Sequence, residues 1–145
     1  MNSQKSKAEI LQETIDWYAA DPDERRAVSM SGECMYSTAE GTACCAVGRV
    51  LEDPWRAECE YGGDPANSIP ENWFRPEYRG HVALFWERLQ GLHDHGCNWT
   101  AWGISEDGVE CIMEIAEEFQ IPKSSIQVPG TGKTLLEYTL NHGNA

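Results

Sequence analysis

Basic residues are scarce in this sequence. Lysine and arginine together number 11 against 24 aspartates and glutamates, which gives a formal net charge of −13 at pH 7. A field of this sign repels nucleic acid and anionic membrane surfaces, because proteins that follow phosphate groups carry the opposite charge. We therefore expect neither a nucleic-acid partner nor a membrane partner. The charge is compatible with a basic protein partner or with solubility alone.

Long apolar segments are also missing. The residues that follow Met1 are polar, and no apolar stretch of the signal-peptide type comes after them. No run approaches the ~20 apolar residues that cross a bilayer. These absences predict a cytoplasmic protein, in which the six cysteines are reduced thiols.

The length and the aromatic content indicate one domain with a core. The chain has 145 residues, of which 41% are hydrophobic, including six Trp, five Tyr and three Phe. Each aromatic ring buries a large area, which compensates for a modest share of aliphatic residues. We expect residues 1–145 to form a single domain.

Three segments have the hydrophobic spacing of amphipathic helices. Ser6 and Glu9 form a capping box before the first of them, and Asp107 can cap the third. The predicted helices cover approximately residues 6–20, 82–92 and 107–119.

Strand signal is confined to two short segments rich in Cys, Val and aromatic residues, Glu33–Tyr36 and Ala43–Val47. Gly41 lies in the turn between them, so the pattern predicts a β-hairpin in which Cys34 lies opposite Cys45. The fold class expected from these elements is α+β, with a small β-hairpin or short sheet packed against about three helices.

Residues 54–76 form a long irregular loop rich in proline and aromatic residues. A loop of this length is usually functional or mobile. Its aromatic side chains, Trp55, Tyr61, Trp73 and Phe74, are candidate anchors of a protein interface, since binding hot spots are enriched in Trp and Tyr. They can equally fold back onto the core.

The C-terminal tail, residues 123–145, is expected to add a short strand at 125–128 and a last helical turn. It contains Pro129–Thr134, which looks like the phosphate-binding loop of nucleotide hydrolases. That loop requires glycine at the position occupied here by Gln127. The sequence therefore predicts a glycine-rich turn that does not bind nucleotide.

Cys34, Cys45, His93 and Asp94 are the candidate catalytic residues. A thiol with a histidine and a carboxylate serves nucleophilic acyl transfer, and the two sulfurs with the imidazole of His93 are candidate zinc ligands. Ten residues separate the two cysteines, which is not the short spacing of a zinc knuckle. His93 also falls on the apolar stripe of its helix, so structural roles are favoured and no cofactor is expected, with zinc as the alternative.

The order of these short motifs resembles a group of small uncharacterised proteins of bacteriophages and bacterial genomes. That group carries a C-x-Y…G…C-A-V-G hairpin and a later L-Q-x-x-H-D motif, which match Cys34–Tyr36, Gly41, Cys45–Gly48 and Leu89–Asp94. The resemblance extends over about residues 8–122. It implies a phage or bacterial origin, and thus the host cytoplasm as the site of action, but no mechanism.

The expected function is that of an acidic, non-catalytic binding or inhibitory protein, acting on a host protein with a basic surface. Carboxylates on the third helix either form a solvated face or present a stripe to that partner; they are Glu110, Glu114, Glu117 and Glu118. The alternative is a Cys/His-based hydrolase or zinc-site protein that uses the hairpin cysteines and His93.

Overall fold

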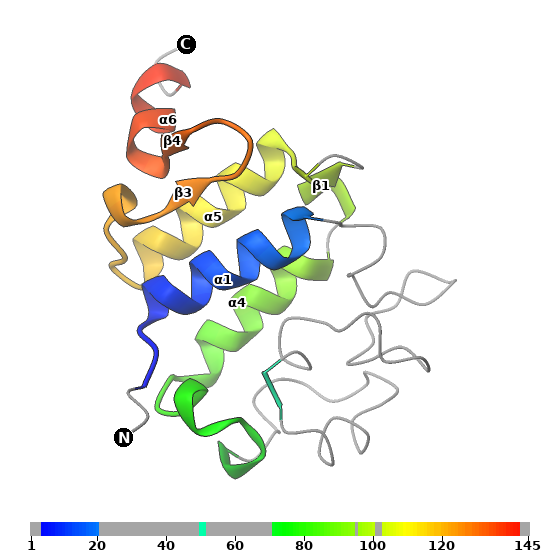
Figure 1. The fold of residues 1–145 in the computed structure, drawn as a ribbon, viewed down its shortest axis with the longest axis vertical. Helices are drawn as coiled ribbons and strands as arrows, with labels where there is room; N and C mark the ends of the chain where they lie inside the picture. The colour runs from blue at the N-terminus through cyan, green and yellow to red at the C-terminus, as the bar shows by residue number, and fades with distance from the viewer. Residues whose placement is uncertain (1–3, 21–49, 52–70, 95, 101–102, 143–145) are drawn as a thin grey trace.

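The described part of the chain has an α+β fold, with four helices and two small antiparallel hairpins (Figure 1). The computed structural model describes residues 4–20, 50–51, 71–94, 96–100 and 103–142. The helices are α1 (Lys7–Ala20), α4 (Ala83–Asp94), α5 (Glu106–Glu118) and α6 (Leu135–His142). The strands are β1 (Trp99–Thr100), β2 (Gly103–Ile104), β3 (Gln127–Val128) and β4 (Lys133–Thr134). Short 3-10 turns occupy Glu71–Trp73, Pro76–Tyr78, Gly96–Asn98 and Lys123–Ser125.

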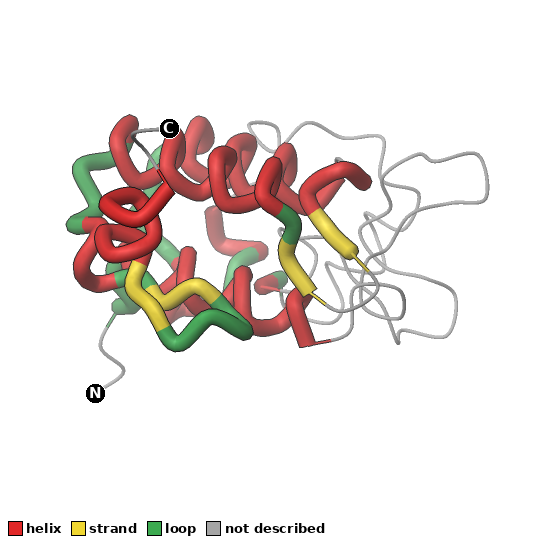
Figure 2. The backbone as a smooth tube through the Cα atoms, turned by 90° about the horizontal axis from the view of Figure 1, so that it is seen from above, coloured by secondary structure: helices red, strands yellow, loops and turns green. Residues whose placement is uncertain are grey.

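The expected fold class is therefore confirmed, although neither of the two observed strand pairs is the hairpin predicted from the sequence. β1 pairs with β2, and β3 pairs with β4, as two separate sheets (Figure 2). The hairpin predicted from Glu33–Tyr36 and Ala43–Val47 lies outside the described residues.

Helix α1 begins at the predicted capping box. The backbone N–H of Ser6 donates to Glu9 Oε1 at 3.0 Å, and the N–H of Glu9 donates to Ser6 Oγ at 3.1 Å. These two bonds satisfy donors that the first helical turn leaves without partners. The buried face is then Ile10, Leu11, Thr14, Ile15, Tyr18 and Ala19.

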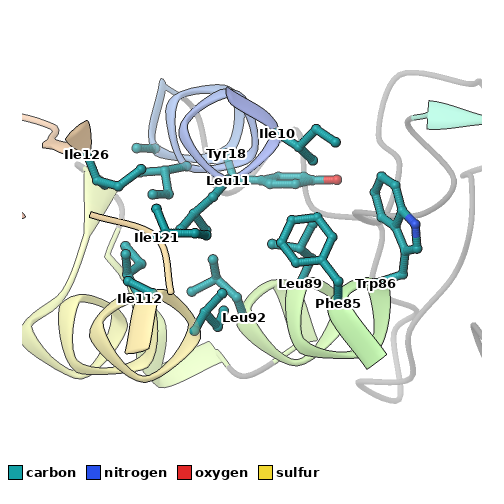
Figure 3. Close-up of a cluster of buried hydrophobic side chains, with 14 of the residues drawn as sticks. Ile10, Leu11, Tyr18, Phe85, Trp86, Leu89, Leu92, Ile112, Ile121 and Ile126 are labelled. Atoms are coloured by element: carbon teal, nitrogen blue, oxygen red, sulfur yellow. The ribbon is translucent and has the colours of Figure 1, made fainter. Parts of the chain in front are cut away.

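Helices α4 and α5 lie side by side beneath this face of α1, and their apolar side chains meet those of α1 in one core (Figure 3). Leu89 of α4 and Ile112 of α5 are fully buried, as is Leu11 of α1. Full burial of one such side chain contributes roughly 1.5–3 kcal/mol. The shared core therefore fixes which faces of the helices remain outside.

Helix α5 begins two residues earlier than predicted. Its N-cap is Ser105, whose Oγ accepts the N–H of Gly108 at 3.1 Å, while Asp107 lies in the first turn. The chain leaves β2 in an extended conformation, so Ser105 is the last non-helical residue and takes the cap position. Asp107 remains favourable there because its charge lies near the positive end of the helix dipole.

The C-terminal segment contributes to the core. Ile126, Val128 and Leu135 are all buried. Of the strand predicted at 125–128, only Gln127–Val128 forms a strand, β3, because Lys123–Ser125 is a 3-10 turn. Helix α6 is eight residues long and not a single turn. A capping box begins it, since the N–H of Thr134 donates to Glu137 Oε1 and the N–H of Glu137 donates to Thr134 Oγ1, each at 3.2 Å.

The glycine-rich segment is the turn of the β3–β4 hairpin. Gly130 and Gly132 have φ angles of 80° and 71°, a region that favours glycine. The strands on either side pair antiparallel, with Val128 opposite Lys133. This geometry confirms the predicted turn; whether the segment binds nucleotide stays a prediction.

The end of the predicted aromatic loop packs on α4. Phe74 forms a bridge with Leu51, and its ring lies 5.0 Å from that of Trp86. Phe74 is 4% exposed, and Trp73 is half-buried against the same core. Trp55 and Tyr61 lie outside the described residues.

Two helical glycines have opposite surroundings. A Cβ added at Gly108 would lie 2.3 Å from the carbonyl oxygen of Asn98 and 2.5 Å from Ile104 Cγ1, whereas a Cβ at Gly91 would meet no atom within 4 Å. Gly108 is therefore required for the close approach of α5 to the turn before β1, and no packing contact requires Gly91.

Gly108→Ala is expected to lower the free energy of unfolding by about 1–3 kcal/mol, because the added methyl group overpacks the contact with Asn98. Gly91→Ala is the matched control and should raise the free energy of unfolding by up to about 1 kcal/mol, through helix propensity. Urea denaturation followed by circular dichroism measures both. Equal changes in the two variants would contradict this assignment.

Candidate functional site

His93, the candidate base or zinc ligand, belongs to the core. It is 0% exposed in the last turn of α4, and its ring meets that of Tyr18 edge-on at 5.1 Å between centroids. This position fits the structural role favoured from the apolar stripe. Asp94 is the last residue of α4, while its side chain, Cys34 and Cys45 lie outside the described part.

The proposed proximity of Cys34 and Cys45 to His93 thus stays a prediction. Within the residues that the structure describes, no three His, Cys, Asp or Glu side chains are grouped to hold a metal ion. Likewise, none of the described helices is both long enough and apolar enough to cross a membrane.

A groove opens between α4 and α5, on the side away from the shared core. We call it the α4–α5 groove. It has a volume of about 580 Å³. Half of its lining residues are acidic, and the lining comprises Glu87, Arg88, Gly91, Asn98, Asp107, Glu110, Cys111, Glu114, Ile115 and Glu118.

The carboxylates along α5 share one helix face. Asp107, Glu110, Glu114 and Glu118 follow one another at spacings of three or four residues, which places successive side chains above one another. Helix α5 buries its opposite stripe, so the acidic side chains are held along the groove by the packing of the core. Like charges held this close concentrate negative potential in the groove.

Arg88 closes one end of the groove. Its Nε lies 2.7 Å from Glu118 Oε1 and its Nη2 lies 3.3 Å from Glu118 Oε2. The pair raises the pKa of Arg88, first through the side-chain hydrogen bond to Glu118. The guanidinium of Arg88 is thus paired with Glu118 at that end of the groove. The other acidic side chains make the charge of the groove negative.

Gly91 lies in the lining of the groove, on α4. The space above its Cα is open, since no heavy atom lies within 4 Å of the Cβ position. Glycine in a helix interior is less stable than alanine by about 1 kcal/mol. The absence of a side chain here widens the groove at a position where any other residue would narrow it.

Cys111 contributes a protonated thiol to the lining. Burial raises its pKa to about 11, with further contributions from Glu114 and Cys97. Because the thiolate is the reactive form, this side chain is a poor nucleophile near neutral pH. It acts in the groove as a small, weakly polar surface.

A second hollow of about 740 Å³, the α1 groove, follows the outer face of α1. It shares no lining residue with the α4–α5 groove. Its lining is Lys5, Ala8, Glu9, Gln12, Glu13, Asp16, Trp17 and Ser125.

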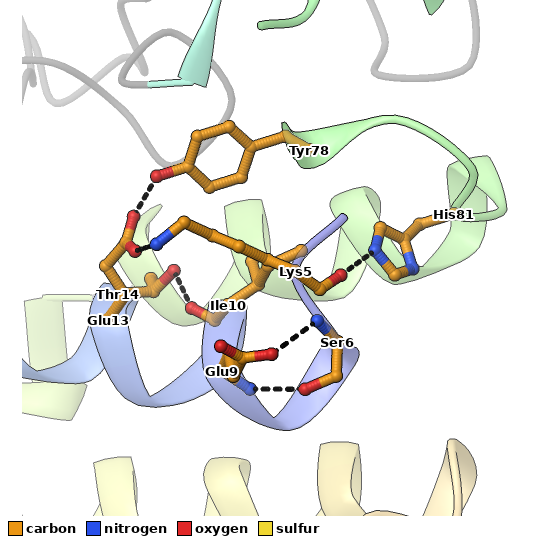
Figure 4. Close-up of polar contacts among 8 residues, drawn as sticks. All are labelled: Lys5, Ser6, Glu9, Ile10, Glu13, Thr14, Tyr78 and His81. Carbon is orange, nitrogen blue, oxygen red and sulfur yellow. Dashed lines mark hydrogen bonds and ion pairs between the residues drawn. The ribbon is translucent and has the colours of Figure 1, made fainter. Parts of the chain in front are cut away.

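A polar cluster anchors the N-terminal segment beside the α1 groove (Figure 4). Lys5 Nζ lies 2.7 Å from Glu13 Oε2, and the hydroxyl of Tyr78 donates to Glu13 Oε1. His81 Nε2 lies 2.9 Å from the carbonyl oxygen of Lys5 and therefore donates to it, while the buried Nδ1 has no hydrogen-bond partner. The hydrogen bond to Glu13 is the first cause of the raised pKa of Lys5.

Some residues of these two grooves were predicted from the sequence. Glu110, Glu114 and Glu118 of the predicted stripe line the α4–α5 groove, whereas Glu117 pairs instead with Lys123 at 2.8 Å. Sequence reasoning missed Gly91, which is not part of the apolar repeat of its helix and lines the α4–α5 groove. Gly91 lies three residues after Arg88, and helical residues three apart share a face. The sequence therefore contained a signal that Gly91 lies on the polar face of its helix.

Comparison of the chain with protein-family models, with curated proteins and with solved structures finds no match. The function is therefore argued from the described surfaces and their chemistry.

The His81 environment makes stability depend on pH. Burial, followed by the charge of Lys7, lowers the pKa of His81 from its ordinary 6.5, against the hydrogen bond to Lys5 and the charge of Glu71. The unfolded chain therefore binds a proton near pH 6.5 before the folded chain does. Stability from this group is present above pH 6.5 and is lost as the pH falls through the lower folded pKa.

His81→Gln keeps an N–H donor but does not titrate. Urea denaturation of both proteins between about pH 7.5 and 5 is expected to show a shallower loss of stability in the variant than in the wild type. Parallel pH profiles for the two proteins would contradict the assignment.

Proposed function

We propose that this protein is a non-catalytic binding protein whose α4–α5 groove receives lysine or arginine side chains of a basic protein partner. The observation that carries the proposal is the groove itself. Carboxylates of both helices line it, and Gly91 leaves it open.

The charge of the groove favours a basic occupant. Glu118 is paired with Arg88, whose charge also acts on Glu114, while Glu110 and Glu114 are exposed and form no ion pair at contact distance among the described residues. The chain as a whole carries −13, so its field accelerates encounter with a cationic surface and disfavours an anionic one.

The shape of the groove fits a long basic side chain. Ile115 and Cys111 supply apolar surface beside the carboxylates. Lys and Arg place their methylene stems along such surface while their charged ends reach acceptors. Gly91 provides the room for that stem. Binding would therefore explain a glycine at a helical position where alanine is more stable.

The chemistry of the lining supports binding over catalysis. Cys111 keeps its proton at neutral pH, and the exposed carboxylates of α5 suit charge recognition. The resemblance to small bacteriophage and bacterial proteins makes a cytoplasmic host protein the partner to test first, under inhibition as well as simple binding.

The double variant Glu110→Gln/Glu114→Gln is expected to weaken binding to that partner roughly 2–30-fold, as the sum of two exposed charge contacts. Affinity capture from bacterial lysate, with wild type and variant in parallel, identifies the partner by its loss from the variant. Stopped-flow mixing of the purified proteins should then show an association rate that falls as salt rises from about 50 to 300 mM.

Glu77→Gln is the control, because it makes the same Glu-to-Gln change once, outside both grooves, and should leave the captured protein in place. Gly91→Leu tests the shape, since a side chain there fills the groove while improving helix propensity. A partner retained equally by the double variant and by Gly91→Leu would overturn the proposal.

A further inference from the structure

We infer that the α1 groove is a second docking surface, which takes a short amphipathic helix of a partner with lysine or arginine beside an apolar residue. This inference does not depend on the α4–α5 groove. The two surfaces share no residue, and the α1 groove lies on residues of α1 other than the inner face that packs on α4 and α5 (Figure 3).

The α1 groove is long enough to bind a short helix. From Ala8 to Trp17 the lining follows α1 for about 14 Å, or two and a half helical turns. Ala8 presents only a methyl group, which permits close approach, and Ser125 forms the facing edge. Ala8 and Trp17 are the apolar residues of the lining, so an apolar side chain of the partner is buried against them on docking.

Trp17 supplies the anchor. It is 39% exposed on a helix whose large aliphatic side chains Ile10, Leu11 and Ile15 are all fully buried. The hot spots of protein interfaces are enriched in tryptophan, and they are surrounded by contacts that exclude water. Here the rim consists of Gln12, Glu13 and Asp16 on the adjacent turn.

The polar side chains of the groove are already held in place. Gln12 Nε2 donates to Asp16 Oδ1 at 3.0 Å and to the carbonyl oxygen of Gln127 at 3.1 Å, and Gln12 Oε1 accepts the N–H of Gln127 at 2.6 Å. Lys5 is held by Glu13. A surface ordered in advance loses less conformational entropy on binding.

The remaining charge selects a basic helix. Lys5 is neutralised by Glu13, which leaves the exposed carboxylates of Glu9 and Asp16 at the two ends of the groove. The pKa of Glu9 is lowered, first by its bond from the Ser6 backbone, so this carboxylate stays ionised. Charge complementarity therefore specifies lysine or arginine on the edge of the docked helix.

The test uses the full chain and a synthetic helical peptide of about 14 residues, with leucines along one face and lysines beside them. A second peptide carries glutamate in place of every lysine. Calorimetric titration is expected to give saturable binding of the lysine peptide alone. Trp17→Ala should weaken it about tenfold or more, and Asp16→Asn should weaken it severalfold and reduce its salt dependence.

Trp17→Phe keeps an aromatic anchor and should retain most of the affinity, so a loss in Trp17→Ala that Trp17→Phe does not share is assigned to the anchor and not to unfolding. Gly91→Leu should bind the peptide as the wild type does, which separates this surface from the α4–α5 groove. The inference is overturned by no saturable binding up to about 1 mM, by equal binding of the glutamate peptide, or by unchanged binding in Trp17→Ala and Asp16→Asn together. Self-association of the wild type that Asp16→Asn or Trp17→Ala abolishes would instead assign the groove to a second copy of this chain and overturn the basic helix.

Discussion

Burial of one face of α1 against α4 and α5 is the contact on which the described structure depends. Leu11, Ile15 and Tyr18 are fully buried from α1, as are Leu89 and Leu92 from α4. Once these stripes face inward, helical periodicity requires the polar stripes to face outward. Both grooves follow from this constraint, because each is built on the outer side of a helix whose inner side is committed to the core.

The second constraint is the excess of negative charge. A chain at −13 must keep its carboxylates in water or beside cations, and the structure does both. Arg88 pairs with Glu118 across two helices, and Lys123 pairs with Glu117. Such exposed pairs contribute about 0–1 kcal/mol each, so they position side chains more than they stabilise the fold.

The carboxylates that remain exposed are the reason for proposing binding as the function. Repulsion along α5 slightly destabilises the isolated protein, and a cationic partner would relieve it. The same argument applies to Glu9 and Asp16 on α1, where Ala8 and Trp17 add apolar area. In the proposed complexes, charge would select the partner and accelerate encounter, while Trp17 and the groove walls would supply the contacts that slow dissociation.

The helices could be predicted from local sequence signals. Features that depend on contacts between residues distant in sequence could not be predicted. Ser6 and Glu9 mark the start of α1 because a capping box needs only its own four residues. The start of α5 was placed two residues late, because Ser105 takes the cap through the path of β2. The capping box of Thr134 and Glu137 is equally local and marks the start of α6, for which the sequence analysis predicts only a last helical turn.

The grooves lay beyond sequence reasoning for a physical reason. Gly91 and Gly108 are both helical glycines, yet one faces open space and the other a carbonyl oxygen at 2.3 Å. Only the packing of α4, α5 and the turn before β1 distinguishes them. His93 shows the converse, since its place on an apolar stripe was sufficient to predict its burial.

Backbone-amide NMR of the isotope-labelled protein, titrated with its purified partner, tests the central claim most directly. The account predicts shift changes that centre on Gly91 of α4 and on Glu110 and Glu114 of α5, and that weaken as salt screens the groove. A complex that forms while the amides of α4 and α5 along this groove remain unchanged would contradict it.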